Sequence, residues 1–339
     1  MPTYAKQKDA YPIVHLEETD VDLPSNPNSR LRYVYFKQIA KGGKCNIQSC
    51  KDLHLRRVIC YKTLRPELAK DPAERKRFIR EARVTAMLQH PNTIPTYELG
   101  RDASGNYYFT MKLVYGATLR ELLEGEGEFI YPAHGRALPN LIRIVEQVAH
   151  ALHYAHQHGV VHRDIKPENV LIGPFSEVLV LDWGMAKVEG ESTEESPSAP
   201  VQPMSATERK AAGDDLGLTM ANPLQGSPPY LSPEQLVLRN TVDLRSDIYS
   251  LGAILYEVLT KDRMIPGETV SEVLDYIRNQ VVPRPSDRVE GRDVPEVLEQ
   301  VCLKCVARDP DDRYSSMDQV INELISWQKS TLRGWEAAA

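Results

Sequence analysis

The sequence has few cysteines and no long apolar segment. Its 339 residues include five cysteines, an odd number spread unevenly along the chain, which argues against a disulfide framework and favours a reducing compartment. No apolar run approaches the roughly eighteen residues that a membrane-spanning helix needs. The first residues lack the apolar core of a signal peptide, and Pro2 stands where myristoylation requires glycine. We therefore expect a soluble, cytoplasmic protein without a membrane span.

Positive charge is also in deficit. Lysine and arginine number 41 against 47 aspartate and glutamate residues, so the formal net charge is −6. This balance does not indicate the strongly basic face that binds nucleic acid, and we expect no nucleic-acid partner. Hydrophobic residues make up 42% and charged residues 26% of the chain, which is ordinary for a globular protein with one large or two modest domains.

The first part of the chain has the pattern of a small antiparallel sheet with one helix. Residues 1–30 are polar and lack a sustained period, so we expect an N-terminal extension. Asp71 followed by Pro72 is typical of a helix start and predicts a helix over 72–89. The pair Gly42-Gly43 predicts a hairpin turn. Runs rich in β-branched and aromatic residues predict strands at 33–36, 46–50, 58–61, 96–99 and 107–111.

The rest of the chain has a mainly helical pattern. Residues 329–339 are expected to form a C-terminal tail. The whole pattern predicts an α+β fold with a small antiparallel sheet and one main helix in the first part, and a larger, mainly helical second part. Apolar residues recur at helical spacing over 141–156, 247–260, 294–307 and 316–328, and short strands are predicted at 170–172 and 178–181.

One segment within the helical part, at about 189–224, differs in composition. It is rich in Glu, Ser, Pro and Ala and almost lacks aromatic and β-branched residues. Such a segment cannot bury enough apolar surface to offset the entropy that ordering would cost. We therefore expect it to be a mobile insert.

The run HRDIKPEN at 162–169 carries the strongest chemical signal. Phosphoryl transfer needs a carboxylate beside the attacking hydroxyl, metal ions on the phosphates and cations against the developing charge. Asp164 can supply the carboxylate, and Asn169 offers an oxygen to a metal ion. Asp182, in LDWG at 181–184, supplies a second metal ligand. A solvated charge or a helix cap explains each residue alone, but not the set in this order and spacing.

These motifs resemble those of the eukaryotic-type (Hanks-type) Ser/Thr protein kinase family, and DWG together with YLSPEQ at 230–235 resembles its bacterial branch. The resemblance extends from about Tyr33 to about Trp327. It implies a bilobal protein kinase fold, with an N-lobe at 31–114 and a C-lobe at 115–328. It also implies a signalling enzyme that transfers the γ-phosphate of ATP to Ser/Thr hydroxyls of protein substrates, with Mg²⁺ as the metal and Mn²⁺ as an alternative.

The resemblance assigns further site residues. Lys62 matches the lysine that contacts the ATP phosphates, and Glu81 on the following helix matches its partner. Lys166, two residues after Asp164, matches the Ser/Thr class and takes a catalytic role. The other nucleotide-binding residues that it implies, from the loop over the phosphates to the adenine hinge, are Ala40, Gly42, Gly43, Ile47, Cys60, Met111, Lys112, Val114 and Leu171.

The same comparison implies structural supports outside the catalytic set. Glu234 in the sequence SPE resembles the glutamate that closes the activation segment, and Arg313 resembles its arginine partner. Asp247 resembles the aspartate that holds the catalytic loop. Trp183 replaces the usual phenylalanine and is expected to fill the same hydrophobic pocket with a larger side chain.

The glycine-rich loop departs from the family pattern. Ala40 and Cys45 stand where the family has its outer glycines, and only the middle one, Gly42, is retained. Glycines there let backbone N–H groups approach the phosphates closely, so we expect a weakened clamp on ATP. The departure motivates an alternative, a pseudokinase that serves as a nucleotide-binding scaffold. Retention of every charged catalytic residue argues against it.

A different enzyme class and cysteine- or histidine-based sites have weaker support. A small-molecule phosphotransferase would share Asp164 and the metal ligands, but it should lack the SPE sequence and Arg313. Cys302 and Cys305 have the C-x-x-C spacing of zinc and redox sites, but their apolar helical setting favours core packing. Cys45 is the better redox candidate. We expect no metal site and a surface or hinge-facing position for the clustered histidines His150, His153, His156 and His158.

The activation segment is predicted to be the regulatory element. Asp182 and Glu234 are 52 positions apart, which is long for the family. In the resembling kinases, the arginine that matches Arg163 pairs with a phosphorylated residue of this segment, as a phosphate beside an arginine would favour. We expect autophosphorylation within 192–227, with Thr219 as the best candidate and self-association as its route. The alternative is that Thr219 is one more solvated residue.

Overall fold

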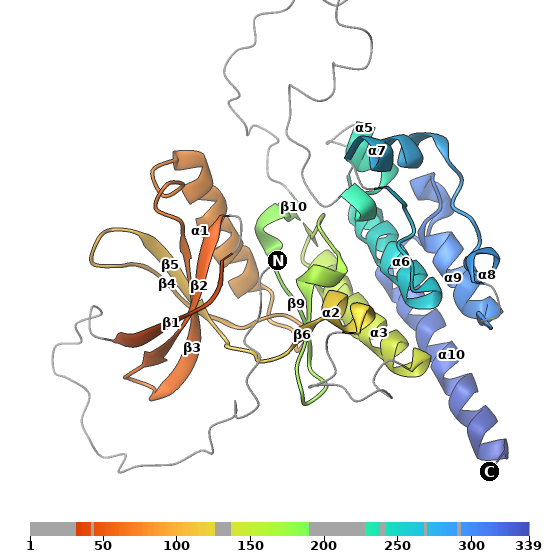
Figure 1. Cartoon of the computed structure of the whole chain (residues 1–339), viewed down its shortest axis with the longest axis horizontal. Coiled ribbons are helices and arrows are strands. Elements are labelled where there is room, and N and C mark those ends of the chain that lie inside the picture. The colour runs from red at the N-terminus through yellow and green to blue at the C-terminus, as the bar shows by residue number, and fades with distance from the viewer. Residues whose placement is uncertain are drawn as a thin grey trace, which may run out of the picture.

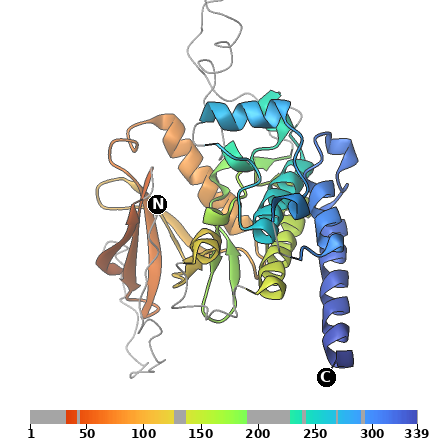
Figure 2. The ribbon, with the colours of Figure 1, turned by 45° about the vertical axis from the view of Figure 1, so that its right-hand side comes forward.

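The computed structural model describes residues 32–41, 44–125, 137–189, 228–237, 242–267, 270–289 and 293–338. The side chains of 40, 41, 236, 237, 270 and 332–338 are also outside the description. Gly42-Gly43, Thr219 and nearly all of the insert therefore lie outside the described residues, as does the expected N-terminal extension. A twisted sheet and one long helix stand beside a larger helical body (Figures 1 and 2), which confirms the predicted α+β fold.

The smaller lobe is a five-stranded antiparallel sheet with the order β1-β2-β3-β5-β4. Its register sets Ile47 opposite Lys62 and Cys60 opposite Met111, which gathers the side chains that line one end of the sheet. Each predicted strand is present, and all but the last extend beyond their predicted bounds at one end or both. The strands are β1 (Tyr33–Lys41), β2 (Cys45–Asp52), β3 (Arg57–Leu64), β4 (Thr96–Arg101) and, unchanged in length, β5 (Tyr107–Met111).

Helix α1 (Pro72–Met87) packs against this sheet. Its start is as predicted, because the Asp71 side chain accepts a hydrogen bond from the Ala73 amide and Pro72 occupies the first turn. The ring of Phe78 lies 5.1 Å from that of Phe109 on β5. The helix ends two residues before the predicted Gln89. This packing brings the inward face of α1, including Glu81, against the sheet.

The larger lobe is built around helix α6, whose residues from Ser246 to Thr260 are all buried. Position 328, the expected end of this lobe, lies inside α10, which ends ten residues later than predicted. The helices are α2 (Leu119–Glu124), α3 (Leu138–Gln157), α5 (Pro233–Val237), α6 (Leu244–Thr260), α7 (Val270–Asn279), α8 (Pro285–Arg288), α9 (Glu296–Cys305) and α10 (Met317–Ala338). The strands are β6 (Ala117–Thr118), β7 (Val160–Val161), β8 (Val170–Ile172), β9 (Val178–Val180) and β10 (Lys187–Val188).

The C-x-x-C pair is part of the core between α6 and α9. Cys302 and Cys305 are buried, and a Cβ atom added to Gly252 would lie only 2.5 Å from the Cys305 Cβ. The glycine therefore allows the two helices to approach closely. Burial raises the pKa of the Cys305 thiol to about 12, and no cluster of metal-ligating side chains occurs in the described part of the chain. The prediction of core packing is confirmed.

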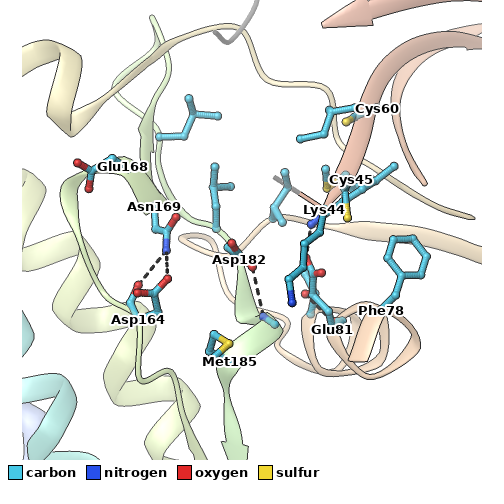
Figure 3. A pocket seen from close by; sticks show the side chains of 18 of the residues that line it. Lys44, Cys45, Cys60, Phe78, Glu81, Asp164, Glu168, Asn169, Asp182 and Met185 are labelled. Atoms are coloured by element: carbon cyan, nitrogen blue, oxygen red, sulfur yellow. Dashed lines mark hydrogen bonds and ion pairs between the residues drawn. The ribbon is translucent and has the colours of Figure 1, made fainter. Parts of the chain in front are cut away.

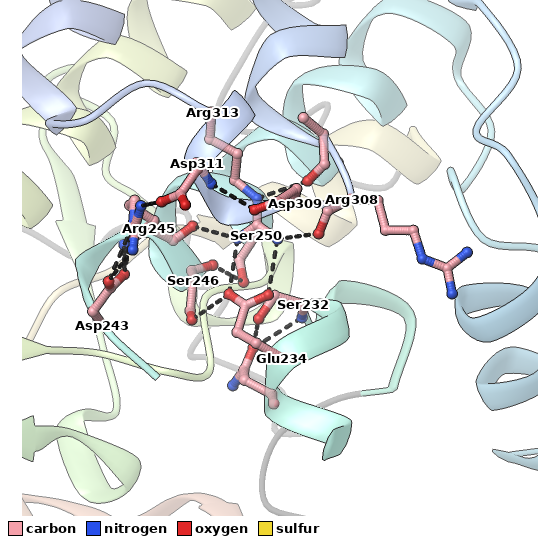
Figure 4. A network of polar contacts seen from close by, with 12 residues as sticks. Ser232, Glu234, Asp243, Arg245, Ser246, Ser250, Arg308, Asp309, Asp311 and Arg313 are labelled. Atoms are coloured by element: carbon pink, nitrogen blue, oxygen red, sulfur yellow. Dashed lines mark hydrogen bonds and ion pairs between the residues drawn. The ribbon is translucent and has the colours of Figure 1, made fainter. Parts of the chain in front are cut away.

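A buried ion pair joins the end of the activation segment to the helical body (Figure 4). Both terminal nitrogens of Arg313 donate to the Glu234 carboxylate at 2.8 Å, and Ser246 donates to its Oε1 at 2.6 Å. The Arg313 side chain is fully buried and also donates to backbone carbonyl groups. The predicted pairing of these two residues is thus present.

We expect Arg313→Met to destabilise the fold strongly. Removal of one partner leaves the Glu234 carboxylate buried without its counter-ion, which typically costs about 3–5 kcal/mol. The free energy of unfolding from denaturant titration measures this loss. Arg308→Met is the matched control, because Arg308 is exposed and bonds one backbone carbonyl group. An equal, small loss in both variants would contradict the prediction.

The contribution of this ion pair should also depend on pH. Burial alone raises the pKa of Glu234, but the hydrogen bonds from Arg313 outweigh it and hold the pKa below its ordinary value of 4.5. A carboxyl group with a lowered folded-state pKa stabilises the fold above its unfolded-state pKa and loses that contribution as the pH falls through the folded-state pKa. The stability difference between wild type and Arg313→Met should therefore be largest near pH 7 and shrink below about pH 4. A difference that stayed constant down to pH 3 would count against the charge-based account.

Candidate active site

A cavity of about 810 Å³ lies between the two lobes (Figure 3). Its lining comes from the sheet, from α1, from the segment that joins the lobes and from the loops around β8 and β9. Of the predicted site residues, those that line the cavity are Ile47, Cys60, Lys62, Glu81, Met111, Lys112, Val114, Asp164, Lys166, Asn169, Leu171 and Asp182. The fold thus brings together residues that are up to 135 positions apart in the sequence.

Three predicted nucleotide-binding positions are not described in full. Gly42 and Gly43 lie outside the described residues, and for Ala40 only the backbone is described, paired with Ile47 across β1 and β2. The cavity also contains apolar residues that the sequence analysis did not assign to it, and three of these, Ile39, Leu113 and Leu181, directly adjoin assigned residues. The sequence signal that could have assigned these three residues to the cavity is their position alone, since each lies beside an assigned residue on the same strand or segment.

Lys62 on β3 and Glu81 on α1 form a buried ion pair. Nζ of Lys62 lies 2.5 Å from Oε1 of Glu81. Burial alone lowers the pKa of Lys62, but the carboxylates of Glu81 and Asp182 outweigh it and raise the pKa well above its ordinary value. Lys62 is therefore a fixed positive charge in the cavity, held in place by α1.

Asp164 lies on the loop between β7 and β8 and lines the cavity. Its Oδ2 accepts from Lys166 Nζ at 3.0 Å and from Asn169 Nδ2 at 3.3 Å. Its Oδ1 is buried and has no hydrogen-bond partner among the described residues. A buried acceptor without a partner is costly unless a ligand supplies a donor. Oδ1 is therefore the Asp164 oxygen that still lacks a donor, beside the cationic Lys166.

Asn169 and Asp182 face each other across the same space (Figure 3). The Asn169 amide donates through Nδ2 to the Asp164 carbonyl group at 2.8 Å, which leaves its Oδ1 as an acceptor. Asp182 has a left-handed backbone, with φ of 62°. Although burial alone raises its pKa, the charges of Lys62 and Lys166 outweigh this effect and lower it. The site thus offers one ionised carboxylate and one amide oxygen, a donor set that Mg²⁺ accepts when phosphate and water complete its shell.

Asp247 on α6 fixes the backbone of the catalytic loop. Its carboxylate accepts from the amides of His162 and Arg163, both at 2.8 Å, and from His156 Nε2 at 2.8 Å. The role expected for Asp247 in holding this loop agrees with these bonds. The expectation for His156 is wrong, because its side chain is buried against α6 instead of at the surface. His156 lies on the last turn of α3, the end that packs against α6.

Aromatic packing also supports the catalytic loop that carries Asp164. The His162 ring lies 4.5 Å from the ring of Trp183, which is fully buried. The Asp164 amide donates to His162 Nδ1 at 3.2 Å, and the His162 Nε2 lies 3.1 Å from the Leu181 carbonyl oxygen. Because a carbonyl oxygen only accepts, Nε2 carries the proton and His162 is neutral. The neutral ring therefore bridges the two loops that carry Asp164 and Asp182.

Arg120 forms a buried charge cluster under the cavity floor. Its guanidinium group lies 2.5 Å from Glu257 Oε1 and 2.9 Å from Glu168 Oε1, and it also contacts the Tyr230 hydroxyl. Tyr230 donates to the other Glu257 oxygen at 2.8 Å. The cluster ties α2 and α6 to the segment that follows the insert. The sequence analysis missed it, because Glu257 lies 137 residues from Arg120.

Cys45 lines the cavity at the start of β2. Burial, only partly offset by the Lys62 charge, raises the pKa of its thiol to about 11. The thiolate is the reactive form of cysteine, so little of this residue is reactive near neutral pH. The structure therefore argues against the redox role considered for Cys45.

Comparisons with known proteins agree with the geometry. Residues 33–325 match the model of the protein kinase domain. The chain is 35% identical over 301 residues to the serine/threonine-protein kinase PknD of Protochlamydia amoebophila, covering 87% of this chain and 30% of that protein. It is 34% identical over 303 residues to the serine/threonine-protein kinase PknB of Mycobacterium leprae, covering 88% and 43%. The chain therefore spans less than half the length of these relatives.

The family match covers most of the chain, and the motifs that the sequence analysis singled out lie inside it. Both relatives carry the name of serine/threonine-protein kinases and come from bacteria, as the resemblance predicted. With the cavity, the Lys62–Glu81 pair and the unpartnered oxygen of Asp164 in place, these matches show that the chain belongs to the protein kinase family, in its bacterial Ser/Thr branch.

Proposed function

We propose that this chain transfers the γ-phosphate of ATP to Ser or Thr hydroxyl groups of proteins. The observation that carries the proposal is the buried, unpartnered Oδ1 of Asp164, set beside the Lys166 ammonium group in the cavity. A hydroxyl group that donates to Oδ1 would be oriented for attack and would have an acceptor for its proton. Lys166 is placed to offset the negative charge that develops on the transferred group.

The cavity also fits ATP and a divalent cation. The adenine would lie among Cys60, Met111 and Leu171, against the backbone of the segment at 112–114, and the phosphates near Lys62. Asn169 and Asp182 would hold Mg²⁺, or Mn²⁺ in its place, which would neutralise charge on the phosphates. Mg²⁺ is commonly held by one or two carboxylates together with phosphate oxygens and water, which is the shell proposed here.

The pseudokinase alternative has little support from the site. A scaffold that only binds nucleotide does not need a buried carboxylate oxygen without a partner. Such an oxygen lowers stability, and proteins retain this cost where a reaction uses the group. The relatives named above are called kinases. A cytoplasmic location is part of the proposal and is supported by the five free cysteines. Separately, no helix in the described ranges is long and apolar enough to cross a membrane.

Asp164→Asn should abolish most transfer but preserve nucleotide binding. The amide cannot accept the hydroxyl proton, and loss of a general base typically lowers the rate by about 10²–10⁴-fold. Transfer of radiolabelled γ-phosphate to protein in the presence of Mg²⁺ measures turnover, and fluorescence titration with a labelled ADP measures binding. Asp275→Asn, on the exposed side of α7, is the matched control. Near-normal transfer by Asp164→Asn would refute the assigned role.

Asp182→Asn separates the metal role from that of the base. Since this carboxylate is one of two proposed ligands, its loss should weaken nucleotide binding in Mg²⁺ and leave binding in EDTA little changed. Equal affinities of Asp182→Asn and wild type in Mg²⁺ would exclude Asp182 as a metal ligand.

We further propose that the kinase autophosphorylates between residues 192 and 227, a stretch outside the described residues, through association of two copies. Arg163 supports this proposal, because its Nε donates to the Met185 carbonyl oxygen at 2.7 Å and so places the guanidinium group beside the start of the activation segment. A phosphate that reached it would gain charge-assisted hydrogen bonds.

Thr219→Ala should lower transfer activity if Thr219 is the residue modified, and deletion of 191–211 should be tolerated. Mass spectrometry of the active protein locates the phosphate, and the rate should depend on protein concentration if one copy modifies another. Full activity without any phosphate in 192–227 would contradict this mechanism.

A further inference from the structure

Helix α1 carries two buried glutamates on one face, and each pairs with a lysine from the sheet. Glu81 pairs with Lys62 of β3, and Glu74 pairs with Lys44, which directly precedes β2. The two glutamates are seven residues apart, which corresponds to two helical turns and a rise of about 10 Å. The helix is therefore attached to the sheet side of the cavity at two points, of which only the Lys62 pair was expected from the sequence.

The Lys44–Glu74 contact is well formed. Nζ of Lys44 lies 2.9 Å from Oε1 and 3.0 Å from Oε2 of Glu74, so the ammonium group contacts both carboxylate oxygens. Arg77, one turn later on α1, donates to the same Oε1 at 2.6 Å. The Lys44 carbonyl group also accepts from the Arg65 amide at 3.0 Å. Lys44 is thus held through its backbone by the end of β3 and through its side chain by α1.

The position of Lys44 gives this contact a role in nucleotide binding. Lys44 is the residue before Cys45 and belongs to the loop over the phosphates, and both Lys44 and Glu74 line the cavity. The outer glycines of this loop are replaced by Ala40 and Cys45, so close approach of the backbone to phosphate is restricted. A contact that holds the Lys44 end of the loop beside the cavity would offset part of this loss in binding.

The pair is more important for the loop than for the helix. Glu74 keeps a counter-ion in Arg77 when Lys44 is absent, and α1 keeps its own contact through Glu81. The Lys44 side chain, in contrast, is 58% exposed and has no other ion pair among the described residues. Loss of this contact would therefore free the loop without leaving a buried carboxylate unpaired.

We propose that Lys44 and Glu74 form a second lysine–glutamate clamp that holds the Lys44 end of the phosphate-covering loop against α1. Both are positioning residues: Glu74 places Lys44, and Lys44 places the loop. The clamp links loop position to the helix that also holds Lys62, so nucleotide affinity depends on the position of α1. The kinetic part of this inference rests on the proposed kinase function, whereas the binding part does not.

The test uses Lys44→Met, Glu74→Gln and the double variant. A partly exposed ion pair contributes up to about 1 kcal/mol, so each single variant should raise the Kd for Mg²⁺ with a fluorescent ADP about three- to fivefold, or roughly 0.7–1 kcal/mol at 1.4 kcal/mol per tenfold change. The double variant should be no weaker than the singles, because either change breaks the same contact. The KM for ATP should rise in parallel, with kcat and the KM for a protein acceptor within about twofold of wild type.

Matched controls separate the clamp from general effects of charge. Lys51→Met and Glu67→Gln remove exposed charges in the same lobe and should leave the Kd unchanged. Lys44→Arg keeps the cation and should restore most of the affinity. Melting temperatures of all variants show whether the fold is intact. If Glu74→Gln alone is unstable, the comparison of Lys44→Met with Lys44→Arg still tests the clamp.

Several outcomes would overturn the inference. If Lys44 bound phosphate directly, Lys44→Met would weaken binding while Glu74→Gln, which releases Lys44, would leave it unchanged or tighter. Additive losses in the double variant, or unchanged affinity in both singles, would also refute the clamp. If the wild type transferred no phosphate, the proposed function would fail, and the Kd values would still decide whether the clamp exists.

Discussion

The catalytic loop depends on one buried carboxylate, that of Asp247 at the start of α6. An unpaired charge in the interior would cost more than the margin by which proteins are folded, and here three donors offset that cost. Burial raises the pKa of Asp247, but the hydrogen bonds from His156 and from the Arg163 amide outweigh it and lower the pKa, so the group stays ionised. Two of its donors are the consecutive amides of His162 and Arg163, which means that the carboxylate sets the backbone path and not only one side chain.

This path includes a strained residue. Arg163 has a φ of 67°, a conformation that costs of order 1 kcal/mol or more for a residue with a side chain. The bond from its amide to Asp247 and the bond from its Nε to the Met185 carbonyl oxygen hold it in place. The turn at Arg163 directs the next residue, Asp164, into the cavity with Oδ1 unpartnered. Burial of one carboxylate in the core thus positions the functional group of another at the cavity, where strain and an unpaired acceptor are retained for chemistry.

Sequence analysis could predict the parts of this arrangement that have local signals. HRDIKPEN and LDWG are each an unbroken run of residues. Asp71-Pro72 marks the start of α1 by the chemistry of the first turn of the helix. Contacts between distant residues leave no such signal. His156 was placed at the surface because helical spacing alone does not tell which face of α3 meets α6, 91 residues away. The Lys44–Glu74 and Arg120–Glu257 pairs were missed for the same reason, since an exposed charge and a buried ion pair look alike until the topology brings the partners together.

The charged contacts around the site differ in how deeply they are buried, and this difference bears on the substituted glycine-rich loop. In the larger lobe, Asp247, Arg313 and Arg120 are almost fully buried and have several partners each, so loss of one would disturb the fold itself. In the smaller lobe, Lys44 is largely exposed, and the contribution of such a pair is small and adjustable. Ala40 and Cys45, which replace the outer glycines, lie in this smaller lobe. Nucleotide binding can therefore change there without loss of the base or the metal ligands. Substitutions in the loop should act on how tightly nucleotide is held, because Asp164, Asn169 and Asp182 are fixed by the other lobe.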